Sequence, residues 1–330
     1  MHAPEFWSGH DLTARLAIAA LTPLGWLYGA SVARKAARAT PHRPAARVIC
    51  IGNLTAGGSG KTPVALAVAR ALTARGLKPV FLTRGYRGRV AGPAFVDPAA
   101  NTAEDVGDEP LLLARAAPVI VSRNRAAGAA LADANGFNAI VMDDGHQNFD
   151  LAKDLSLVVV DAETGFGNGR ILPAGPLREG VAQGLSRADA AVLVGDGSPA
   201  LADFRGPVLR VHLRTVDPAG LMQKRVVAFA GIGRPQKFFD TLKALGADVR
   251  DARRYADHHA YTAAEIARLQ CRARDLDALL ITTEKDFVRL PPVLREGIAV
   301  LPVAALFDDA AAFEHLLARL LPQTSGYAVS

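Results

Sequence analysis

Short apolar runs recur along most of the chain, and most of them end in glycine or in polar residues. Such runs, rich in Val, Ile and Leu, are typical of strands buried on both faces of a parallel sheet. Between them, apolar residues recur every three or four positions, which is the spacing of an amphipathic helix. The runs that predict strands are 48–51, 79–83, 119–121, 137–142, 157–160, 190–194, 226–230, 278–283 and 298–303. Strands that alternate with helices in this way predict an α/β fold with a mostly parallel sheet.

The long uncharged segment 16–33 predicts a helix near the N-terminus. Its length is at the lower limit for crossing a bilayer, and Trp26 and Tyr28 are of the types that favour a membrane interface. Three basic residues follow within 34–38. A signal peptide fits poorly, because the first fourteen residues contain no Lys or Arg. A core helix and a membrane-associated helix both fit, and the basic flank favours the second, with the following domain on the cytoplasmic side.

A glycine-rich turn connects the strand at 48–51 to the next helical pattern. Its sequence is Thr55-Ala56-Gly57-Gly58-Ser59-Gly60-Lys61-Thr62. This is the layout of a phosphate-binding P-loop, in which backbone N–H groups and a helix N-terminus hold the phosphates of a nucleotide such as ATP. Lys61 is expected to reach the β- and γ-phosphates, and Thr62 to bind Mg²⁺. Thr55 stands where the motif has glycine. The alternative is a connecting turn that binds nothing, but the order of strand, loop, Lys-Thr and helix favours the nucleotide site.

A second signal follows the strand at 137–142, which ends in Asp143-Asp144-Gly145-His146-Gln147. P-loop enzymes use an apolar strand that ends in Asp to hold Mg²⁺, directly or through water, and Asp143 has this position. The alternative is a polar surface turn. Two adjacent carboxylates beside a His and a Gln favour a functional site that binds charged groups.

Basic residues gather where three other strands or loops end. They are Arg84, with Tyr86, after 79–83; Arg123 and Arg125 after 119–121; and Arg178 in the Pro/Gly-rich loop 172–179. Ligands bind at the carboxyl ends of strands in open α/β sheets, and guanidinium groups pair well with phosphates. We therefore expect phosphate or headgroup contacts here, with solvated basic turns as the alternative.

After residue 220 the alternation of strands and helices restarts. We therefore expect three parts. Residues 1–45 form a membrane-associated helix and a basic linker, 46–220 form a P-loop domain, and 221–330 form a second, smaller α/β lobe that closes the active-site cleft.

Composition narrows the partners and the compartment. A net charge of +6 permits nucleic acid, anionic lipid or phosphorylated ligands. The chain has no zinc-finger spacing, no RNA-binding aromatic signature and no internal repeat, so we expect no nucleic-acid partner. Two cysteines argue against a disulfide framework and suit a reducing compartment.

Together, the motifs resemble those of the tetraacyldisaccharide 4'-kinases of lipid A biosynthesis. The match runs in order over nearly the whole chain, and a Thr at the first P-loop position belongs to that family's pattern. The segments that carry the resemblance are 52–63, Thr83-Arg84-Gly85-Tyr86, Gly107-Asp108-Glu109-Pro110, 143–147, 172–179, Asp257-His258 and Thr283-Glu284-Lys285-Asp286. No single segment is decisive, whereas the ordered set is very specific.

The resemblance implies that 46–220 is a P-loop kinase domain that uses ATP and Mg²⁺ at the cytoplasmic face of the bacterial inner membrane. Its substrate would be the lipid A disaccharide 1-phosphate, which it would phosphorylate on the 4'-hydroxyl. The N-terminal helix would contact inner-membrane lipids, and the arginines at the strand ends would bind the 1-phosphate.

The resemblance also implies roles that the pattern alone leaves open. Asp108 becomes the general base, paired with His258 from the second lobe, although a helix cap is the simpler interpretation of Asp108. His259 is the rival for this pairing, and the spacing favours neither histidine. The other implied roles are catalysis for Lys61 and Asp144, metal binding for Thr62, Asp143 and Glu109, and substrate binding for Arg84, Tyr86, Arg123, Arg125, Gln147 and Arg178.

Two other functions stay open at the level of sequence. One is a nucleotide-dependent membrane switch, because 283–286 loosely resembles a guanine-reading Asn-Lys-x-Asp, although it lacks the Asn. The other is a soluble small-molecule P-loop kinase or synthetase whose N-terminal helix belongs to the core. A preference for GTP would indicate the first, and detergent-independent activity without residues 1–40 would indicate the second.

Overall fold

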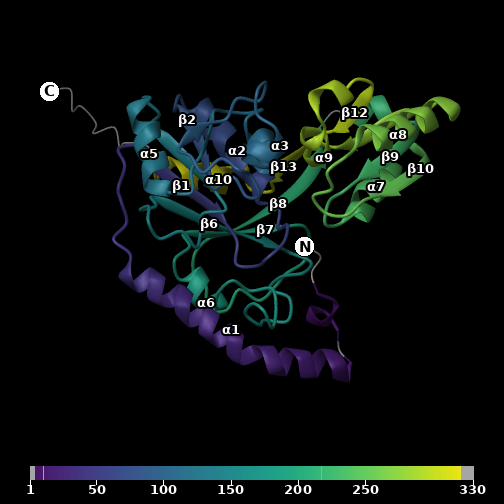
Figure 1. Ribbon diagram of the computed structural model, residues 1–330. Helices are drawn as coiled ribbons and strands as arrows, with labels where there is room; N and C mark the ends of the chain where they lie inside the picture. Colours follow the sequence, from purple (N-terminus) through teal and green to yellow (C-terminus); the bar gives the residue numbers. More distant parts are fainter. Residues whose placement is uncertain (1–3, 10, 217, 321–330) are drawn as a thin grey trace.

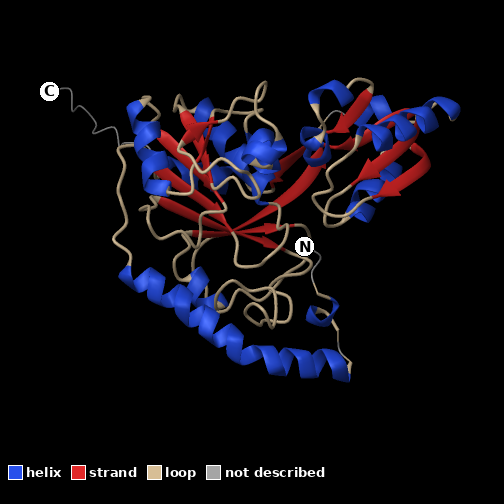
Figure 2. Cartoon of the chain, in the orientation of Figure 1, coloured by secondary structure: helices blue, strands red, loops and turns tan. Residues whose placement is uncertain are grey.

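The computed structural model describes residues 4–9, 11–216 and 218–320, and it has two α/β lobes and a long N-terminal helix (Figures 1 and 2). In these residues the larger sheet has nine strands in the order β13-β8-β7-β6-β1-β5-β2-β4-β3. They are β1 (Arg47–Gly52), β2 (Pro79–Thr83), β3 (Ala94–Phe95), β4 (Val119–Val121), β5 (Ala139–Asp143), β6 (Leu155–Asp161), β7 (Ala190–Val194), β8 (Val208–Thr215) and β13 (Val303–Phe307). The central strands run parallel, and the two edge strands, β3 and β13, pair antiparallel. The predicted mostly parallel sheet is confirmed.

Helices cover both faces of this sheet because successive residues of a strand point to opposite sides. Ile49 and Ile51 of β1 belong to the core beneath α2 and α10, whereas Val48 and Cys50 pack on the side of α5. The helices of the first lobe are α2 (Lys61–Ala74), α3 (Ala103–Val106), α4 (Asp108–Leu113), α5 (Arg125–Ala134), α6 (Val181–Leu185) and α10 (Ala310–Ala318). The central strands, buried on both faces, explain the uninterrupted apolar runs.

The second lobe is a smaller sheet with the order β10-β9-β11-β12, in which all pairs are parallel. Its strands are β9 (Arg225–Ala230), β10 (Asp248–Arg254), β11 (Leu279–Thr283) and β12 (Ile298–Leu301), and its helices are α7 (Pro235–Ala244), α8 (Ala263–Asp275) and α9 (Glu284–Arg289). Short 3-10 turns are η1 (Glu5–Trp7), η2 (Pro218–Leu221) and η3 (Pro292–Leu294). In Figure 1 this lobe is the green and yellow body at the upper right.

The chain returns from the second lobe to the first, which corrects one expectation. The predicted final strand, 298–303, is two strands: β12 ends at Leu301, and β13 begins at Val303 in the larger sheet, paired with β8. Phe313 of α10 then packs into the core beneath α2. Within the expected lobe 221–330, residues 303–320 therefore belong to the first lobe, and 321–330 lie outside the described residues. Pro302 lies at the break, and a proline inside an apolar run is the sign of an interrupted strand that the sequence offers, because it cannot donate a hydrogen bond to the sheet.

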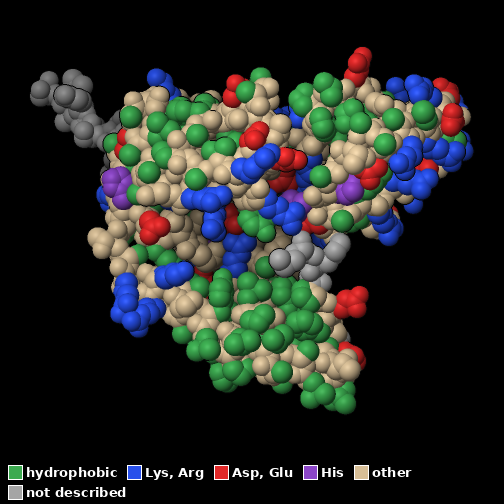
Figure 3. All heavy atoms as spheres, in the orientation of Figure 1, with side chains coloured by type: hydrophobic (Ala, Val, Ile, Leu, Met, Phe, Trp, Pro, Cys, Tyr) green, Lys and Arg blue, Asp and Glu red, His purple; other side chains and the backbone are tan. Residues whose placement is uncertain are grey.

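Helix α1 (Leu12–Arg38) is longer than predicted and lies along the first lobe (Figure 1). Asp11 caps it, accepting a hydrogen bond from the Ala14 N–H at 3.3 Å. Gly25 and Gly29 are buried against Ile171, where a Cβ on Gly25 would lie 2.8 Å from the Ile171 carbonyl oxygen. The helix is long and apolar enough to cross a membrane by length and composition, and only 17% of its apolar window is buried. Figure 3 shows the hydrophobic surface in this region. A core helix would be mostly buried.

Candidate functional site

The phosphate-binding loop lies between β1 and α2, at the carboxyl end of the larger sheet. Gly60 has a φ of +86°, a left-handed conformation that favours glycine, and α2 begins at Lys61. Beneath the loop, the buried Asn53 amide donates to Ser59 Oγ at 3.1 Å. The α2 N-terminus therefore faces the space where a P-loop holds phosphates.

Thr55 departs from the P-loop pattern without strain. It forms an antiparallel bridge with Leu177, so its backbone is extended and needs no glycine. The neighbouring Ala56 N–H donates to Pro176 O at 2.7 Å, and Arg178 N–H donates to Leu54 O at 2.7 Å. The loop 172–179 is therefore paired with the start of the P-loop, which places Arg178 beside it.

Asp143 and Asp144, adjacent at the end of β5, have opposite surroundings. The Asp143 side chain is buried, and neither carboxylate oxygen has a hydrogen-bond partner among the described residues. Burial, reinforced by the Glu109 carboxylate, raises the pKa of Asp143 to about 8, against the pull of Lys61. Asp144 instead accepts from Arg178 Nη1 at 2.9 Å and lies 3.5 Å from Lys61 Nζ. Those positive charges outweigh its own burial and hold the pKa of Asp144 below its usual range.

This donor set fits Mg²⁺. A divalent ion would satisfy the two orphaned oxygens of Asp143 and remove the cost of its buried charge. Mg²⁺ takes oxygen ligands and is commonly held by one or two carboxylates together with substrate phosphates. The described residues contain no group of three or more His, Cys, Asp or Glu side chains that would form an all-protein metal cage. Thr62 and Glu109, the other two predicted ligands, lie in the first turns of α2 and α4.

Asp108 meets His258 across the two lobes. Asp108 is the first residue of α4, and its Oδ2 lies 3.0 Å from Nδ1 of His258 in the loop between β10 and α8. The helix cap is Gly107, so the simpler interpretation of Asp108 as an N-cap is not observed. Burial opposes ionisation of Asp108, but the hydrogen bond from His258 and the charges of Lys285 and Arg289 outweigh it and hold the pKa of Asp108 well below its usual range.

His259 faces away from this pair. Its Nε2 lies 3.1 Å from Glu265 Oε1, and its ring packs between Tyr255 and Tyr261. His258, by contrast, has a φ of +60°, a conformation uncommon for residues other than glycine, and it donates its N–H to Gly231 O at 3.1 Å. The structure therefore places His258, and not its rival, against Asp108.

The predicted arginines after β4 point in different directions. Arg125 is buried, and it donates from Nη1 to Ser122 O. Its burial lowers the pKa of Arg125 to about 10, and the nearby Asp144 carboxylate acts the other way. Arg123 is exposed and donates to Gly88 O at 3.3 Å. Arg125 therefore belongs to the charged centre of the site, and Arg123 lies towards the loop after β2.

Arg84, Tyr86 and Gln147 occupy three different places. Arg84 is exposed after β2, close enough for its charge to act on Arg125. The Tyr86 ring meets the His258 ring edge-on, with centroids 6.4 Å apart. Gln147 lies under the P-loop, where its Nε2 donates to Asn53 O and to Glu179 Oε1, both at 2.9 Å. Glu179 is buried and also accepts from Arg187 at 2.5 Å. Gln147 thus ties the P-loop to the loop 172–179.

Two charged side chains near Asp108 are absent from the sequence-based site. Arg289 Nη2 lies 2.6 Å from Asp108 Oδ2, and Lys285 Nζ lies 3.9 Å from the same oxygen. Lys285 is inside the motif 283–286, and Arg289 lies one helical turn after Asp286. The helical spacing predicts that Arg289 and Asp286 share one face of α9, but it gives no sign of the contact with Asp108.

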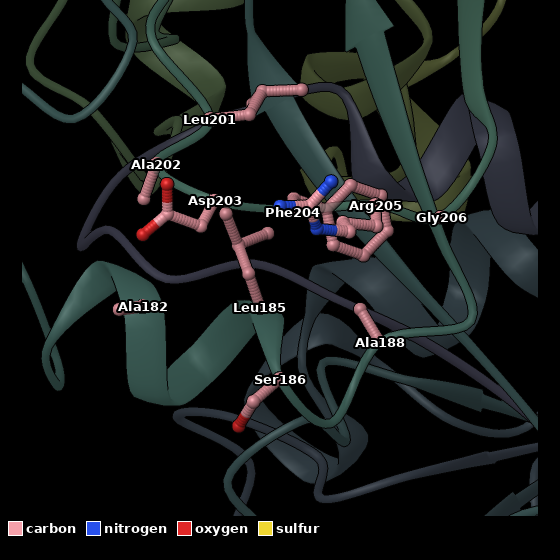
Figure 4. Close-up of a pocket in the computed structure, with 10 residues that line it drawn as sticks. All are labelled: Ala182, Leu185, Ser186, Ala188, Leu201, Ala202, Asp203, Phe204, Arg205 and Gly206. Carbon is pink, nitrogen blue, oxygen red and sulfur yellow. The ribbon is translucent and has the colours of Figure 1, made fainter.

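The cavity in Figure 4 lies apart from these residues. It has a volume of about 400 Å³ and lies between α6 and the loop 201–206, with Leu185 and Phe204 among its lining side chains. None of its lining residues is a predicted site residue.

A glycine-rich loop that opens a helix, beside a parallel strand ending in a buried carboxylate, defines a P-loop nucleotide-binding protein. Residues 17–322 match the family model described as tetraacyldisaccharide-1-P 4'-kinase, and the chain belongs to that family.

Individual relatives agree with this assignment. A tetraacyldisaccharide 4'-kinase from Rhodospirillum rubrum is 52% identical over 329 residues, which cover 97% of this chain and 98% of that protein. One from Maricaulis maris is 47% identical over 330 residues, covering 96% of each. Among solved structures, LpxK from Aquifex aeolicus, crystallised in complex with ATP, has a TM-score of 0.76 and 26% identity, covering 92% of this chain and 99% of that chain.

Proposed function

We propose that this protein is a Mg²⁺-dependent kinase that transfers the γ-phosphate of ATP to the 4'-hydroxyl of tetraacyldisaccharide 1-phosphate in lipid A biosynthesis. The observation that supports the proposal most strongly is that the nucleotide-binding residues and the Asp108–His258 pair lie in one site. Lys61 and Asp143 lie at the carboxyl end of the first sheet, and the Asp108–His258 pair closes the same site from the boundary with the second lobe. The family membership supplies the acceptor.

The P-loop residues 55–62 would bind the ATP phosphates through backbone N–H groups, with Lys61 neutralising charge. Thr62, Asp143 and Glu109 would hold Mg²⁺, which when bound supplies charge neutralisation on the phosphate oxygens. Asp144 would keep Lys61 and Arg178 in place, because it bonds both cations.

Asp108 would orient the acceptor. Its Oδ2 is occupied by groups of the second lobe, whereas its Oδ1 accepts only the Glu109 N–H, at 3.1 Å, among the described residues. Oδ1 is therefore the atom that accepts a hydrogen bond from the sugar hydroxyl.

The hydroxyl oxygen attacks the γ-phosphorus, the bond to the β–γ bridging oxygen breaks, and ADP leaves with that electron pair. The proton passes to the Asp108–His258 pair. A loose transition state needs little base strength, so the low pKa of Asp108 is compatible with this role.

The remaining basic residues would hold the lipid headgroup. Tyr86 lies against His258, Arg84 is close enough for its charge to act on Arg125, and Arg123 contacts the loop after β2. A phosphate on the acceptor gives the guanidinium groups a partner.

The exposed face of α1 would bring the enzyme to its substrate. An acylated disaccharide stays in the bilayer, so the enzyme must bind there, and ATP places it at the cytoplasmic face of the bacterial inner membrane. Leu16, Trp26 and Leu27 are exposed apolar side chains on α1, and the helix ends in a basic cluster that suits anionic headgroups.

Transfer of labelled phosphate tests this proposal. The protein is incubated with γ-labelled ATP, Mg²⁺ and tetraacyldisaccharide 1-phosphate in mixed micelles, beside a Lys61→Ala control. We expect label in the lipid fraction with the unchanged protein. Transfer no greater than in the control would contradict the proposal.

A further inference from the structure

The motif Thr283–Asp286 builds a buried polar cluster at the carboxyl end of the second sheet. We name Gly231, Tyr261, Thr283 and Asp286 the Asp286 cluster. Asp286 is fully buried, and its Oδ1 accepts from the Gly231 N–H at 3.0 Å and from the Tyr261 hydroxyl at 2.9 Å. Its Oδ2 accepts from Thr283 Oγ1 at 2.7 Å. A buried carboxylate with all these partners has one orientation, because each lost bond leaves an unpaired polar group.

The Asp286 cluster holds one cation, Arg289. Its Nη1 donates to Asp286 Oδ1 at 2.9 Å and to Gly231 O at 2.6 Å. The Arg289 side chain is only 4% exposed. The same Gly231 carbonyl oxygen accepts the His258 N–H at 3.1 Å, so one backbone atom fixes both Arg289 and the loop that carries His258. There is little room for a side chain at Gly231, because a Cβ would lie 2.9 Å from Ala256 O and 3.0 Å from Tyr261 Oη.

The other side of the guanidinium leaves the second lobe and binds Asp108. Arg289 Nε and Nη2 donate to Asp108 Oδ2 at 2.9 and 2.6 Å. His258 Nδ1 and Lys285 Nζ approach the same oxygen at 3.0 and 3.9 Å. The second lobe therefore concentrates its charge on Oδ2, and this sets the direction of Oδ1. The planar fork of arginine fixes orientation in a way that a single ammonium cannot.

We infer that Arg289 is a positioning residue for phosphate transfer: held by the Asp286 cluster, it fixes the Asp108 carboxylate so that Oδ1 faces the acceptor hydroxyl. The inference rests on the role proposed for Asp108. It also gives the motif 283–286 a function: Thr283 and Asp286 hold Arg289 in the orientation in which it binds the Asp108 carboxylate.

An alternative is that Arg289 only joins the lobes. The contact of Glu284 with Arg115 of the first lobe, at 3.1 Å, already joins α9 to the C-terminal side of α4 at the surface. A contact that only holds the lobes together does not need a buried guanidinium that donates to Asp108 on one side and to Asp286 and Gly231 on the other. The two explanations differ in what happens when Asp108 is absent, because a positioning residue then has nothing to position.

The test is a double-mutant comparison on the full-length protein in mixed micelles. We measure kcat, together with KM for ATP, for the unchanged protein, Arg289→Met, Arg289→Lys, Asp108→Ala and Asp108→Ala/Arg289→Met. Arg295→Met is the matched control, because Arg295 donates to Leu290 O and Val288 O within the second lobe and does not contact Asp108. Thermal unfolding and ATP binding check that each variant is folded.

We expect Arg289→Met to lower kcat about 100-fold while KM for ATP changes less than about threefold, because ATP binds in the other lobe. Arg289→Lys should restore about a tenth of the original kcat, since it keeps the charge and loses the fork. In the Asp108→Ala background, Arg289→Met should cost about threefold or less, and Arg295→Met should stay within about threefold of the unchanged protein.

Equal losses from Arg289→Met with and without Asp108 would overturn the inference, and so would an unchanged kcat in folded Arg289→Met. If Arg289→Met does not fold, the same comparison is made with Arg289→Lys, for which about a tenfold loss is expected only when Asp108 is present. Absence of transfer by the unchanged protein contradicts the proposed function and the inference together. Activity that is insensitive to Arg289 contradicts the inference alone.

Discussion

At the scale of residues, neighbours in sequence take different tasks because the backbone aims them differently. His258, held with a positive φ, faces Asp108, whereas His259 is turned into an aromatic cluster and bonds Glu265. Sequence spacing cannot distinguish the two, because one residue's backbone conformation decides which ring reaches the site. The same holds for Asp143 and Asp144, because Asp144 pairs with Lys61 and Arg178 whereas neither Asp143 oxygen has a hydrogen-bond partner among the described residues.

The first prediction concerns the Asp108–His258 pair. We expect Asp108→Ala and His258→Ala each to lower kcat by about 10²- to 10⁴-fold, the usual contribution of general acid–base groups. The double variant should be little worse than either single one, because the two groups act as a unit. Initial rates of lipid phosphorylation measure this, with His259→Ala as the neighbouring control. Multiplicative losses would show that the two act independently.

The second prediction concerns pH and His146. This ring is buried between Ser156 Oγ at 3.2 Å and Gly184 O at 2.9 Å, and burial, together with the charge of Lys153, lowers the pKa of His146 to about 3. The ordinary value is 6.5, so between these two values the unfolded chain binds more protons than the folded one. The free energy of unfolding should therefore fall as the pH is lowered from 6.5 towards 3.

His146→Gln should remove this part of the pH dependence. Urea unfolding of both proteins at several pH values measures it, and the difference between them isolates His146 from the carboxylates. Parallel curves for the two proteins would show that His146 does not cause the loss.

At the scale of elements, α1 has two faces with different tasks. One face packs through Gly25 and Gly29 on the loop that contains Ile171, and the Trp7 indole donates to Pro173 O at 3.1 Å in the same loop. The other face exposes apolar side chains. We propose that this helix lies in the membrane surface, because packing along one side leaves only the opposite side for lipid.

The third prediction is that charge on the exposed face of α1 weakens membrane binding. Leu16 and Leu27 are 61% and 68% exposed. Burying one such side chain contributes about 1.5–3 kcal/mol, so Leu16→Asp and Leu27→Asp should each weaken binding to anionic vesicles about tenfold or more. Co-sedimentation with phosphatidylglycerol-containing vesicles measures this. Val293→Asp, which changes an 86% exposed residue of the second lobe, is the control, and an equal loss there would refute the assignment.

Most strands could be predicted from the sequence, and those that could not be predicted share a physical cause. Strands β1, β2 and β5 to β7 are buried on both faces and appear as apolar runs. Strand β10 carries charged residues at Arg250, Arg253 and Arg254, because it is the edge of its sheet. Strand β8 alternates Arg210, His212 and Arg214 with apolar residues, which is a weaker signal than a continuous apolar run. Edge and half-buried strands lack the continuous apolar run on which the prediction relied.

At the scale of the whole molecule, the site exists because two lobes meet. The first lobe contributes the P-loop, Asp143 and Asp108, and the second contributes His258, Lys285 and Arg289. On another side, Arg234 at the start of α7 pairs with Asp161 at the end of β6. The P-loop and Asp143 could be found from sequence because strand, loop and helix are contiguous. Arg289 could not, because it lies 181 positions from Asp108 and only the fold brings the two together.

The central claim is transfer of phosphate from ATP to the 4'-hydroxyl of the lipid disaccharide. Its most direct test is the position of the label after reaction with γ-labelled ATP. Mild acid cleaves a phosphate from the anomeric carbon but leaves a phosphate ester at the 4'-position intact. We predict labelled lipid that keeps its label through mild acid with the unchanged protein and not with Lys61→Ala. Label found only in inorganic phosphate, or released from the lipid by mild acid, would contradict the claim.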